Sequence, residues 1–378
     1  MHFVFLRTVP TSSKMPNSSD FIRKLLGESF NDETCDICGN ISVNNNNNIV
    51  SKSDFHPPVM NRRSLVIPSI PHISARESYM IQRVKATVPK LSQTLTKGQC
   101  GRIGIIGGCH NTYTGSAYFS AISALKCGAD IVHIFCEKEA GPVLRQYSPE
   151  LIIHPSLDQE YGMVELDKWL PRLDCVVLGP GLGRSQQMIG TISMILEKIK
   201  ILQLPVVIDG DGIEHVRLSP GVLQGYTRAV ITPNTEEFSS LAQSLLDNHQ
   251  ANQDLEKEIP QVLEEVCRSL GYLTIVHKGC SDLVSDGHTT ETCEVGGSPR
   301  RCGGQGDILS GILATLLHWS YTSHQPGQPV TAGWGACRIL RAAAQQAYNT
   351  MGRATTASDI VNHIQFQFDK LFDSETFC

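Results

Sequence analysis

DCVVLGPGLGR, residues 174–184, joins an unbroken apolar run to three glycines. The run from Cys175 to Leu178 fits a β-strand that is buried on both faces, as in parallel sheets. The glycines that follow allow a backbone or a ligand to approach closely. In sheets of this kind, ligands bind outside the carboxyl ends of the strands. The stretch therefore indicates an α/β fold, with either a ligand site or a tight strand–helix turn at Gly179–Gly183.

Similar apolar runs alternate with longer helix-like stretches from Gly101 onward. This alternation predicts a mostly parallel central sheet with helices on both faces, in one domain over residues 98–375. The predicted strands are residues 102–107, 131–136, 175–179, 205–209, 229–232 and 273–277. The predicted helices are residues 116–127, 187–200, 236–246 and 255–270, with three more that begin near Gly306, Thr331 and Ser358. Ser285-Asp286-Gly287 predicts a hairpin, because Asp-Gly is a strong turn signal.

The first part of the chain has a different character. Residues 1–60 lack apolar periodicity and contain an asparagine run at 44–48, which predicts a disordered or targeting tail. Residues 61–97 form a lead-in segment, with a helix expected over residues 79–88. Cys35 and Cys38 have the spacing of half a zinc site, but a second pair at similar spacing is missing, which favours coincidence.

The extreme N-terminus is compatible with two locations. Arg7 and Lys14 precede the first acidic residue, Asp20, among several serines and threonines. This composition fits a mitochondrial transit peptide. A variable cytosolic tail fits it equally well.

Composition excludes several classes of partner. The formal net charge is -5, which does not favour nucleic acid or an anionic membrane as the main partner. No run of about 18 apolar residues occurs, so no membrane span is expected. The 13 cysteines are scattered through strand-like and helix-like segments, which favours reduced thiols over a disulfide framework. A homo-oligomer is compatible with this composition, and the oligomeric state stays open.

The most specific segment for chemistry is Cys302-Gly303-Gly304-Gln305-Gly306-Asp307, which an apolar helix follows. A helix N-terminus carries about half a positive charge and suits a phosphate. Asp307 lies in the first turn, where it either caps the helix or accepts the proton of an attacking hydroxyl. Arg300 and Arg301 just upstream match a polyphosphate and favour catalysis. The Lys-Ser/Thr ending of a Walker A loop is absent.

Other strand ends carry polar or flexible residues. Gly107-Gly108 and Tyr113-Thr114-Gly115 resemble a dinucleotide loop only loosely, because the full Gly-x-Gly-x-x-Gly is missing. Asp209-Gly210-Asp211-Gly212 fits magnesium, a ribose hydroxyl or a simple turn. Thr232 or Asn234 can cap the next helix, with Glu237 at the capping-box position. Lys278 ends another strand, where it reaches phosphates or solvent. Histidines inside apolar runs, such as His133, are interpreted as packing residues.

In this order, these segments resemble the ATP-dependent NAD(P)H-hydrate dehydratase family, over about residues 83–372. The motifs that carry the resemblance are Gly101-Arg102-Ile103-Gly104-Ile105-Ile106-Gly107-Gly108, Tyr113-Thr114-Gly115, Tyr147-Ser148-Pro149-Glu150-Leu151, Gly179-Pro180-Gly181-Leu182-Gly183 and Arg300-Arg301-Cys302-Gly303-Gly304-Gln305-Gly306-Asp307. Gly210, where alanine is more usual, and Thr235, often a histidine, depart from the pattern. The resemblance implies a ribokinase-like fold, with ATP and Mg²⁺ as co-substrate and cofactor.

The resemblance also implies a reaction. ATP phosphorylates the C6 hydroxyl of the (S)-hydrate of NADH or NADPH, and elimination of the phosphate restores the dihydronicotinamide ring. Asp307 is the expected catalytic residue. The hydrated dinucleotide is expected to contact Gly181, Asn234, Thr235, Glu236, Glu237, Phe238, Ser239, Ser240 and Asp307. ATP is expected to contact Lys278, Gly279, Cys280, Ser281, Asp282, Gly297, Ser298, Pro299, Arg300, Arg301, Cys302, Gly303, Gly304, Gln305 and Gly306.

Two other functional classes stay open from the sequence. A small-molecule kinase of the same fold, of the hydroxymethylpyrimidine or hydroxyethylthiazole type, would keep the glycine loop and Asp307 but release a stable phosphorylated product. A non-catalytic nucleotide-binding module is disfavoured by the intact Asp307 beside an intact loop.

Overall fold

The computed structural model describes residues 74–109, 113–246, 259–294, 296–323 and 328–372. The expectations for the tail at residues 1–60, including Cys35 and Cys38, lie outside these residues. So do residues 61–73 of the lead-in segment, residues 255–258 of a predicted helix and residues 373–375 of the predicted domain. Among the described residues, none of the helices is long and apolar enough to cross a membrane.

The centre of the described structure is a nine-stranded sheet in the order β3-β2-β1-β4-β5-β6-β7-β8-β9. The strands are β1 (Arg102–Ile106), β2 (Ile131–Cys136), β3 (Ile152–Pro155), β4 (Cys175–Leu178), β5 (Val206–Ile208), β6 (Ala229–Ile231), β7 (Thr274–His277), β8 (Asp282–Ser285) and β9 (Thr290–Cys293). Strands β1 to β7 pair in parallel, and β8 and β9 add an antiparallel hairpin at one edge. The predicted α/β fold with a mostly parallel sheet is confirmed.

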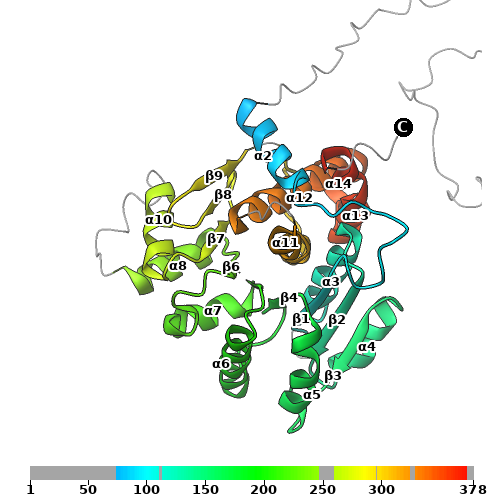
Figure 1. Cartoon of the computed structure of the whole chain (residues 1–378), viewed down its shortest axis with the longest axis vertical. Coiled ribbons are helices and arrows are strands. Elements are labelled where there is room, and N and C mark those ends of the chain that lie inside the picture. Colours follow the sequence, from blue (N-terminus) through cyan, green and yellow to red (C-terminus); the bar gives the residue numbers. More distant parts are fainter. Residues whose placement is uncertain (1–73, 110–112, 247–258, 295, 324–327, 373–378) are drawn as a thin grey trace, which may run out of the picture. The chain divides into compact units, whose positions relative to one another are not determined.

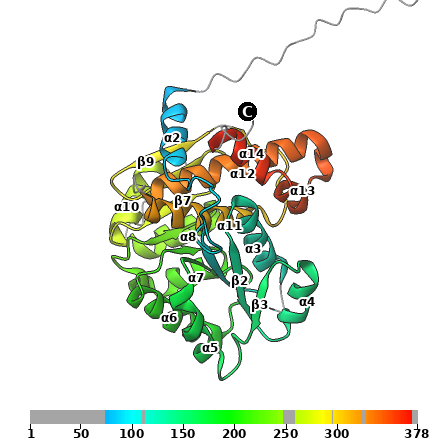
Figure 2. The same cartoon turned by 45° about the vertical axis from the view of Figure 1, so that its right-hand side comes forward.

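Two layers of helices cover the sheet (Figure 1, Figure 2). The helices of the first layer are α2 (Ala75–Lys85), α3 (Gly115–Cys127), α4 (Ala140–Tyr147), α11 (Gln305–Thr322), α12 (Pro329–Met351), α13 (Ala357–Val361) and α14 (Ile364–Phe372). The helices of the second are α5 (Gly162–Trp169), α6 (Gln186–Ile201), α7 (Asp211–Leu218), α8 (Thr235–Leu245) and α10 (Ile259–Ser269). Each layer has its own hydrophobic cluster against the sheet, which explains the apolar strands.

The chain reverses its direction across the sheet between β1 and β4. It first builds β1, β2 and β3 outward, and then returns to place β4 beside β1 before it continues to β9. Such a reversal is a topological switch point, where the loops at the carboxyl ends of the strands diverge and leave a crevice. The fold therefore places the glycine turn after β4 at the position where this class of sheet binds ligands.

The six predicted strands are present with ends that differ by no more than one residue. The predicted helices are present in the described residues, but the helix expected over residues 79–88 begins at Ala75 and ends at Lys85. Strand β3 and helices α4, α5 and α7 were not predicted. The single helix expected after Ser358 is two helices, α13 and α14. His133 packs as interpreted, because its ring lies buried beside His154, with 2.9 Å between the two ring nitrogens.

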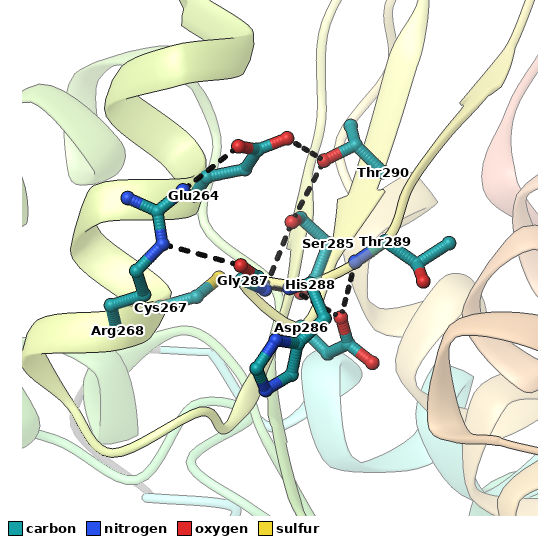
Figure 3. Close-up of polar contacts among 9 residues, drawn as sticks. All are labelled: Glu264, Cys267, Arg268, Ser285, Asp286, Gly287, His288, Thr289 and Thr290. Atoms are coloured by element: carbon teal, nitrogen blue, oxygen red, sulfur yellow. Dashed lines mark hydrogen bonds and ion pairs between the residues drawn. The ribbon is translucent and has the colours of Figure 1, made fainter.

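The hairpin predicted at Ser285-Asp286-Gly287 joins β8 to β9 and is attached to α10 (Figure 3). The Asp286 carboxylate accepts hydrogen bonds from the N–H groups of His288 and Thr289, which closes the turn. Arg268 of α10 donates to the Gly287 carbonyl, at 3.3 Å. These contacts fix the hairpin, whose first residue, Asp282, borders the pocket described below.

Helix α2 of the lead-in segment is part of the domain. Met80 and Val84 are fully buried in the first hydrophobic cluster. Glu77 accepts a 2.8 Å hydrogen bond from Arg338 of α12, and Arg76 pairs with Glu291 of β9. Contacts of this kind with the core indicate that α2 folds together with the sheet.

Substitution of Met80 tests this role of α2. Met80→Ala should lower the free energy of unfolding by about 2–5 kcal/mol, as expected for a large-to-small change in a packed core. Gln82→Ala, on the exposed side of the same helix, is the control and should change it by less than about 0.5 kcal/mol. Chemical denaturation measures both. Equal stability of the two variants would show that α2 is not part of the cooperative unit.

Candidate active site at the switch point

The loops after β1 and β4 pack directly against each other. Gly108 donates its N–H to the Pro180 carbonyl at 3.0 Å, and Cys109 donates to the Gly181 carbonyl at 2.6 Å. A side chain at Gly107 would overlap the Pro180 carbonyl. The glycines at these strand ends therefore allow the backbones of the two loops to approach closely at the switch point.

Gly181 fixes this double loop against the start of α3. Its φ of +57° lies in the left-handed region, and a side chain there would overlap the Tyr113 carbonyl. The same imaginary Cβ would lie 3.2 Å from the Ser116 Cβ. Gly181 and Ser116 are therefore neighbours, and Ser116 in turn reaches the catalytic candidate.

Asp307 lies at the third position of α11, and it is not the N-cap of that helix. The N-cap is Gly304, with φ +93°, and no side chain makes a capping hydrogen bond there. The carboxylate of Asp307 is instead hydrogen-bonded to Ser116 of α3. Of the two roles that the sequence left open, the capping role is therefore not the one adopted in this structure.

The surroundings of Asp307 favour its protonated form. Burial is the main cause, and the negative charge of Asp209 adds to it, so that the pKa of Asp307 rises from 3.8 to about 7. The hydrogen bond from Ser116 and the charge of Lys278 act in the opposite direction. A carboxyl group with this pKa can accept and release a proton near neutral pH.

Lys278 links the charged groups of the site. Its Nζ lies 3.1 Å from Oδ1 of Asp209 and 4.0 Å from Oε2 of Glu237. Burial favours the neutral amine, but the two carboxylates outweigh it and raise the pKa of Lys278. Nζ is also 3.3 Å from the position that a Cβ on Gly306 would take. The ammonium group therefore lies against the glycine loop that precedes α11.

The two carboxylates of the Asp209–Gly212 turn face different partners. Asp209 is buried and accepts hydrogen bonds from Lys278 and from Oγ1 of Thr232, at 2.7 Å for the latter. Asp211 accepts from the Gly183 N–H and from Nε of Arg184. Within the described residues, no cluster of three or more His, Cys, Asp or Glu side chains suited to a metal ion is present. Of the pair, only Asp209 belongs to the charge group around Asp307.

The start of α8 shows the capping box that the sequence allowed. Asn234 accepts from the Glu237 N–H at 2.9 Å, and Glu237 accepts from the Asn234 N–H at 2.8 Å. Thr232 is not the cap. Phe238, one of the expected substrate contacts, is buried in the core, with its ring centroid 5.0 Å from that of His277.

A pocket of about 820 Å³ opens beside these residues. It brings together three segments that are distant in sequence: the start of α8, the loop after β7 and the glycine loop before α11. Many of the ligand contacts expected from the sequence line this pocket. They are Asn234, Thr235, Glu236, Lys278, Gly279, Cys280, Asp282, Gly297, Ser298, Arg301, Cys302, Gly303, Gly304, Gln305 and Gly306. Its lining residues do not include the other expected contacts, which are Gly181, Glu237, Phe238, Ser239, Ser240, Ser281, Pro299, Arg300 and Asp307.

Sequence reasoning missed Arg341, which also lines the pocket, with Leu309, Leu340 and Ala344. Its Nε donates to Oδ2 of Asp282 at 2.6 Å. Its Nη groups donate to the backbone carbonyls of Gly279, Cys280 and Gly296. One buried guanidinium thus holds both walls of the pocket. The sequence shows an arginine within the apolar run of α12. It does not indicate which groups accept the hydrogen bonds of that arginine, because they lie in distant segments.

The fold and the position of the site define a ribokinase-like α/β protein. The fold is similar to that of a ribokinase-like superfamily protein from Enterococcus faecalis, with a TM-score of 0.61, 20% identity and coverage of 77% of this chain and 94% of that chain. It is also similar to the ADP/ATP-dependent NAD(P)H-hydrate dehydratase from Bacillus subtilis, co-crystallised with ATP/Mg²⁺, with a TM-score of 0.57, 20% identity and coverage of 76% and 97%.

Sequence comparison identifies the family within this class. The family model for NAD(P)H-hydrate dehydratase matches residues 103–366. The ATP-dependent (S)-NAD(P)H-hydrate dehydratase of Danio rerio is 44% identical over 300 residues, which cover 78% of this chain and 89% of the relative. The Vitis vinifera protein of the same name is 42% identical, with coverage of 78% and 88%. The chain belongs to the NAD(P)H-hydrate dehydratase family.

Arg341 offers a test of how the pocket is held. Arg341→Lys keeps the positive charge but loses the planar guanidinium group with its several N–H donors. Backbone carbonyl groups that Arg341 binds therefore lose their hydrogen-bond donors. Stability should fall by about 1–3 kcal/mol, the cost of leaving buried polar groups unsatisfied. Arg217→Lys, in a half-exposed pair with Glu214, is the matched control and should change stability by less than about 0.5 kcal/mol. A wild-type melting temperature for Arg341→Lys would contradict the assigned role.

Proposed function

We propose that this chain uses ATP to dehydrate the (S)-hydrates of NADH and NADPH, which restores NADH and NADPH and releases ADP and phosphate. The observation that carries the proposal is the placement of Asp307. Its carboxylate lies in the first turn of α11, beside Lys278 and Ser116, with a pKa near neutrality. Membership in the NAD(P)H-hydrate dehydratase family supports this choice of substrate.

Asp307 is assigned to the first chemical step. The carboxylate takes the proton of the C6 hydroxyl, and the hydroxyl oxygen forms a bond to the γ-phosphorus of ATP as ADP leaves. The second step breaks the bond between C6 and the phosphate oxygen. The neighbouring ring carbon loses a proton to water, and the double bond between the two carbons forms as phosphate leaves. Phosphorylation is needed because a hydroxyl is a poor leaving group, whereas phosphate is a good one.

The ATP half of the site is assigned to the 820 Å³ pocket. Backbone N–H groups of the glycine loop and the N-terminus of α11 suit the phosphates. Lys278 and Arg301, which both line the pocket, supply positive charge. Under this assignment, ATP contacts the segments Lys278–Asp282 and Gly297–Gly306.

Magnesium is proposed to accompany ATP, as in the Bacillus subtilis protein that was co-crystallised with ATP/Mg²⁺. Mg²⁺ is commonly bound by one or two carboxylates together with substrate phosphates. Asp209 fits this requirement as a buried oxygen donor next to Asp307, which is left free to act as the base. The ion would neutralise the charge that develops on the transferred phosphoryl group.

The hydrated dinucleotide is assigned to the turn after β4 and the start of α8, where Asn234, Thr235 and Glu236 line the same pocket as the residues assigned to ATP. Gly181 lies against Ser116, which binds Asp307, so the turn after β4 is close to the reacting hydroxyl. The start of α8, from Asn234 to Ser240, borders the same crevice through Glu237 and its 4.0 Å approach to Lys278. Phe238 would contribute through its backbone, because its side chain is buried.

The fold alone also fits a small-molecule kinase. The hydroxyethylthiazole kinase from Pyrococcus horikoshii has a similar fold, with a TM-score of 0.53 and 17% identity. A kinase would release a phosphorylated product, whereas the proposed enzyme releases inorganic phosphate. The fate of the phosphoryl group therefore separates the two functions.

An activity assay tests the proposed reaction. The protein, mixed with ATP, magnesium and the (S)-hydrate of NADH, should regenerate the absorbance of the dihydronicotinamide ring, with one ADP and one phosphate per NADH. Omission of ATP should abolish the signal. Formation of ADP with the phosphoryl group retained on the organic product would instead identify a kinase.

Replacement of Asp307 tests the proposed base. Asp307→Asn should lower turnover by roughly 10²–10⁴-fold, because the amide cannot accept the proton. In the wild-type protein, kcat/KM should fall as the pH drops below about 7, where Asp307 is protonated. Asp167→Asn, at an exposed position of α5, is the control and should keep wild-type kinetics.

The same variant has a stability signature. The pKa of Asp307 is raised from 3.8 to about 7 on folding, so the native state is penalised once the group ionises. Relative to wild type, Asp307→Asn should therefore become more stable as the pH rises between these two values, and the difference should stay constant above them. Near-normal turnover together with no pH-dependent stability difference would remove Asp307 from the mechanism.

A further inference from the structure

Arg184 ends the glycine turn after β4, three residues beyond Gly181. It is on the same turn as Gly181, and it is not among the contacts that the family resemblance implies. Its side chain keeps 67% of its surface exposed. An exposed arginine on a turn is ordinarily free to move, but this one is held.

Asp211, the first residue of α7, holds Arg184 in place. Oδ1 of Asp211 accepts from Nε of Arg184 at 2.7 Å, and Oδ2 accepts from the Gly183 N–H at 2.9 Å. Both carboxylate oxygens are therefore used to fix this turn. Within the described part of the chain, the Arg184 side chain makes one hydrogen bond, through Nε. Its two Nη groups therefore remain available to a ligand.

The guanidinium is on the same loop as Gly181, one of the proposed dinucleotide contacts. It is also within electrostatic reach of Glu237, which belongs to the proposed contacts on α8. The hydrogen bond to Asp211, and then the charges of Asp211, Glu214 and Glu237, raise the pKa of Arg184, so it is fully charged at any physiological pH.

The carboxylates near the site favour a further cation for the dinucleotide. Asp209, Glu237 and Asp307 place carboxylates at this edge, and Lys278 is already paired with Asp209. Arg341 is paired with Asp282 on the ATP side. A dinucleotide carries two further negative charges on its diphosphate, which these carboxylates repel. A guanidinium with free Nη groups matches phosphate oxygens in both charge and geometry.

We propose that Arg184, positioned by Asp211, binds the diphosphate of the hydrated dinucleotide. This inference rests on the proposed function, because it takes the hydrated dinucleotide as the substrate. It adds a diphosphate subsite on the turn after β4, separate from the glycine loop and Lys278 that are assigned to ATP. Asp211 acts through Arg184 and is a positioning residue.

Steady-state kinetics of Arg184 variants test the subsite. Arg184→Gln should raise the KM for the hydrate of NADH by about 10- to 100-fold, as expected for lost hydrogen bonds to a charged group. The kcat and the KM for ATP should stay within about twofold of wild type. Arg184→Lys, which keeps the charge without the fork, should give an intermediate KM. Asp211→Asn should raise the same KM by a smaller factor.

Arg217→Gln is the matched control, because Arg217 also pairs with a carboxylate but through the half-exposed side of α7. It should leave all three constants unchanged. A wild-type KM for the hydrate in Arg184→Gln, or an equal rise in the KM for ATP, would overturn the inference.

A binding measurement separates this inference from the proposed function. NADPH, which has the same diphosphate, is titrated into protein without ATP, and its fluorescence is followed. Weaker binding by Arg184→Gln than by wild type supports the subsite, and equal binding overturns it. Failure of wild-type protein to regenerate NADH would instead contradict the proposed reaction.

Discussion

The packing of the turn after β4 against the loop after β1 is the constraint on which the rest of the site depends. Because the sheet reverses its strand order between these two strands, their loops diverge and leave room for a ligand. Glycines at 107 and 181 let the backbones touch where any side chain would clash. This contact sets the position of Ser116, and Ser116 orients Asp307. The catalytic candidate is thus held by the fold rather than by a mobile loop.

Electrostatic coupling then gives the site its chemistry. Asp209 and burial raise the pKa of Asp307, while Lys278 and Ser116 limit that rise. Lys278 is itself held by Asp209 at 3.1 Å and reaches toward the glycine loop before α11. A change in Asp209, Lys278 or Ser116 therefore alters the proton affinity of Asp307. The network joins the residues that follow β5 and β7 to residues of α3 and α11, which explains why none of the motifs alone determines the function.

The sequence was most informative where the pattern is local. Continuous apolar runs predict buried strands such as β4. The capping box at Asn234 is predicted because Glu237 follows three residues later. Strand β3 was missed because it is four residues long, lies at the sheet edge and ends in Pro155. The role of Asp307 stayed open between cap and base, because its hydrogen bond to Ser116 joins helices 191 positions apart in sequence. Arg341 was missed for the same reason, since its acceptors lie on other segments.

The buried pair of Arg341 and Asp282 shows what such long-range contacts contribute. A buried ion pair gives little net stability, because desolvation offsets most of the attraction between the charges. Its value here is geometric, since the guanidinium also binds three backbone carbonyls on both walls of the pocket. The Asp211–Arg184 pair has a similar arrangement, although it is exposed and weaker. In both cases a carboxylate from one element fixes an arginine of another. The scaffold therefore uses ion pairs between elements to hold these arginines in place beside the loops that follow β4 and β7.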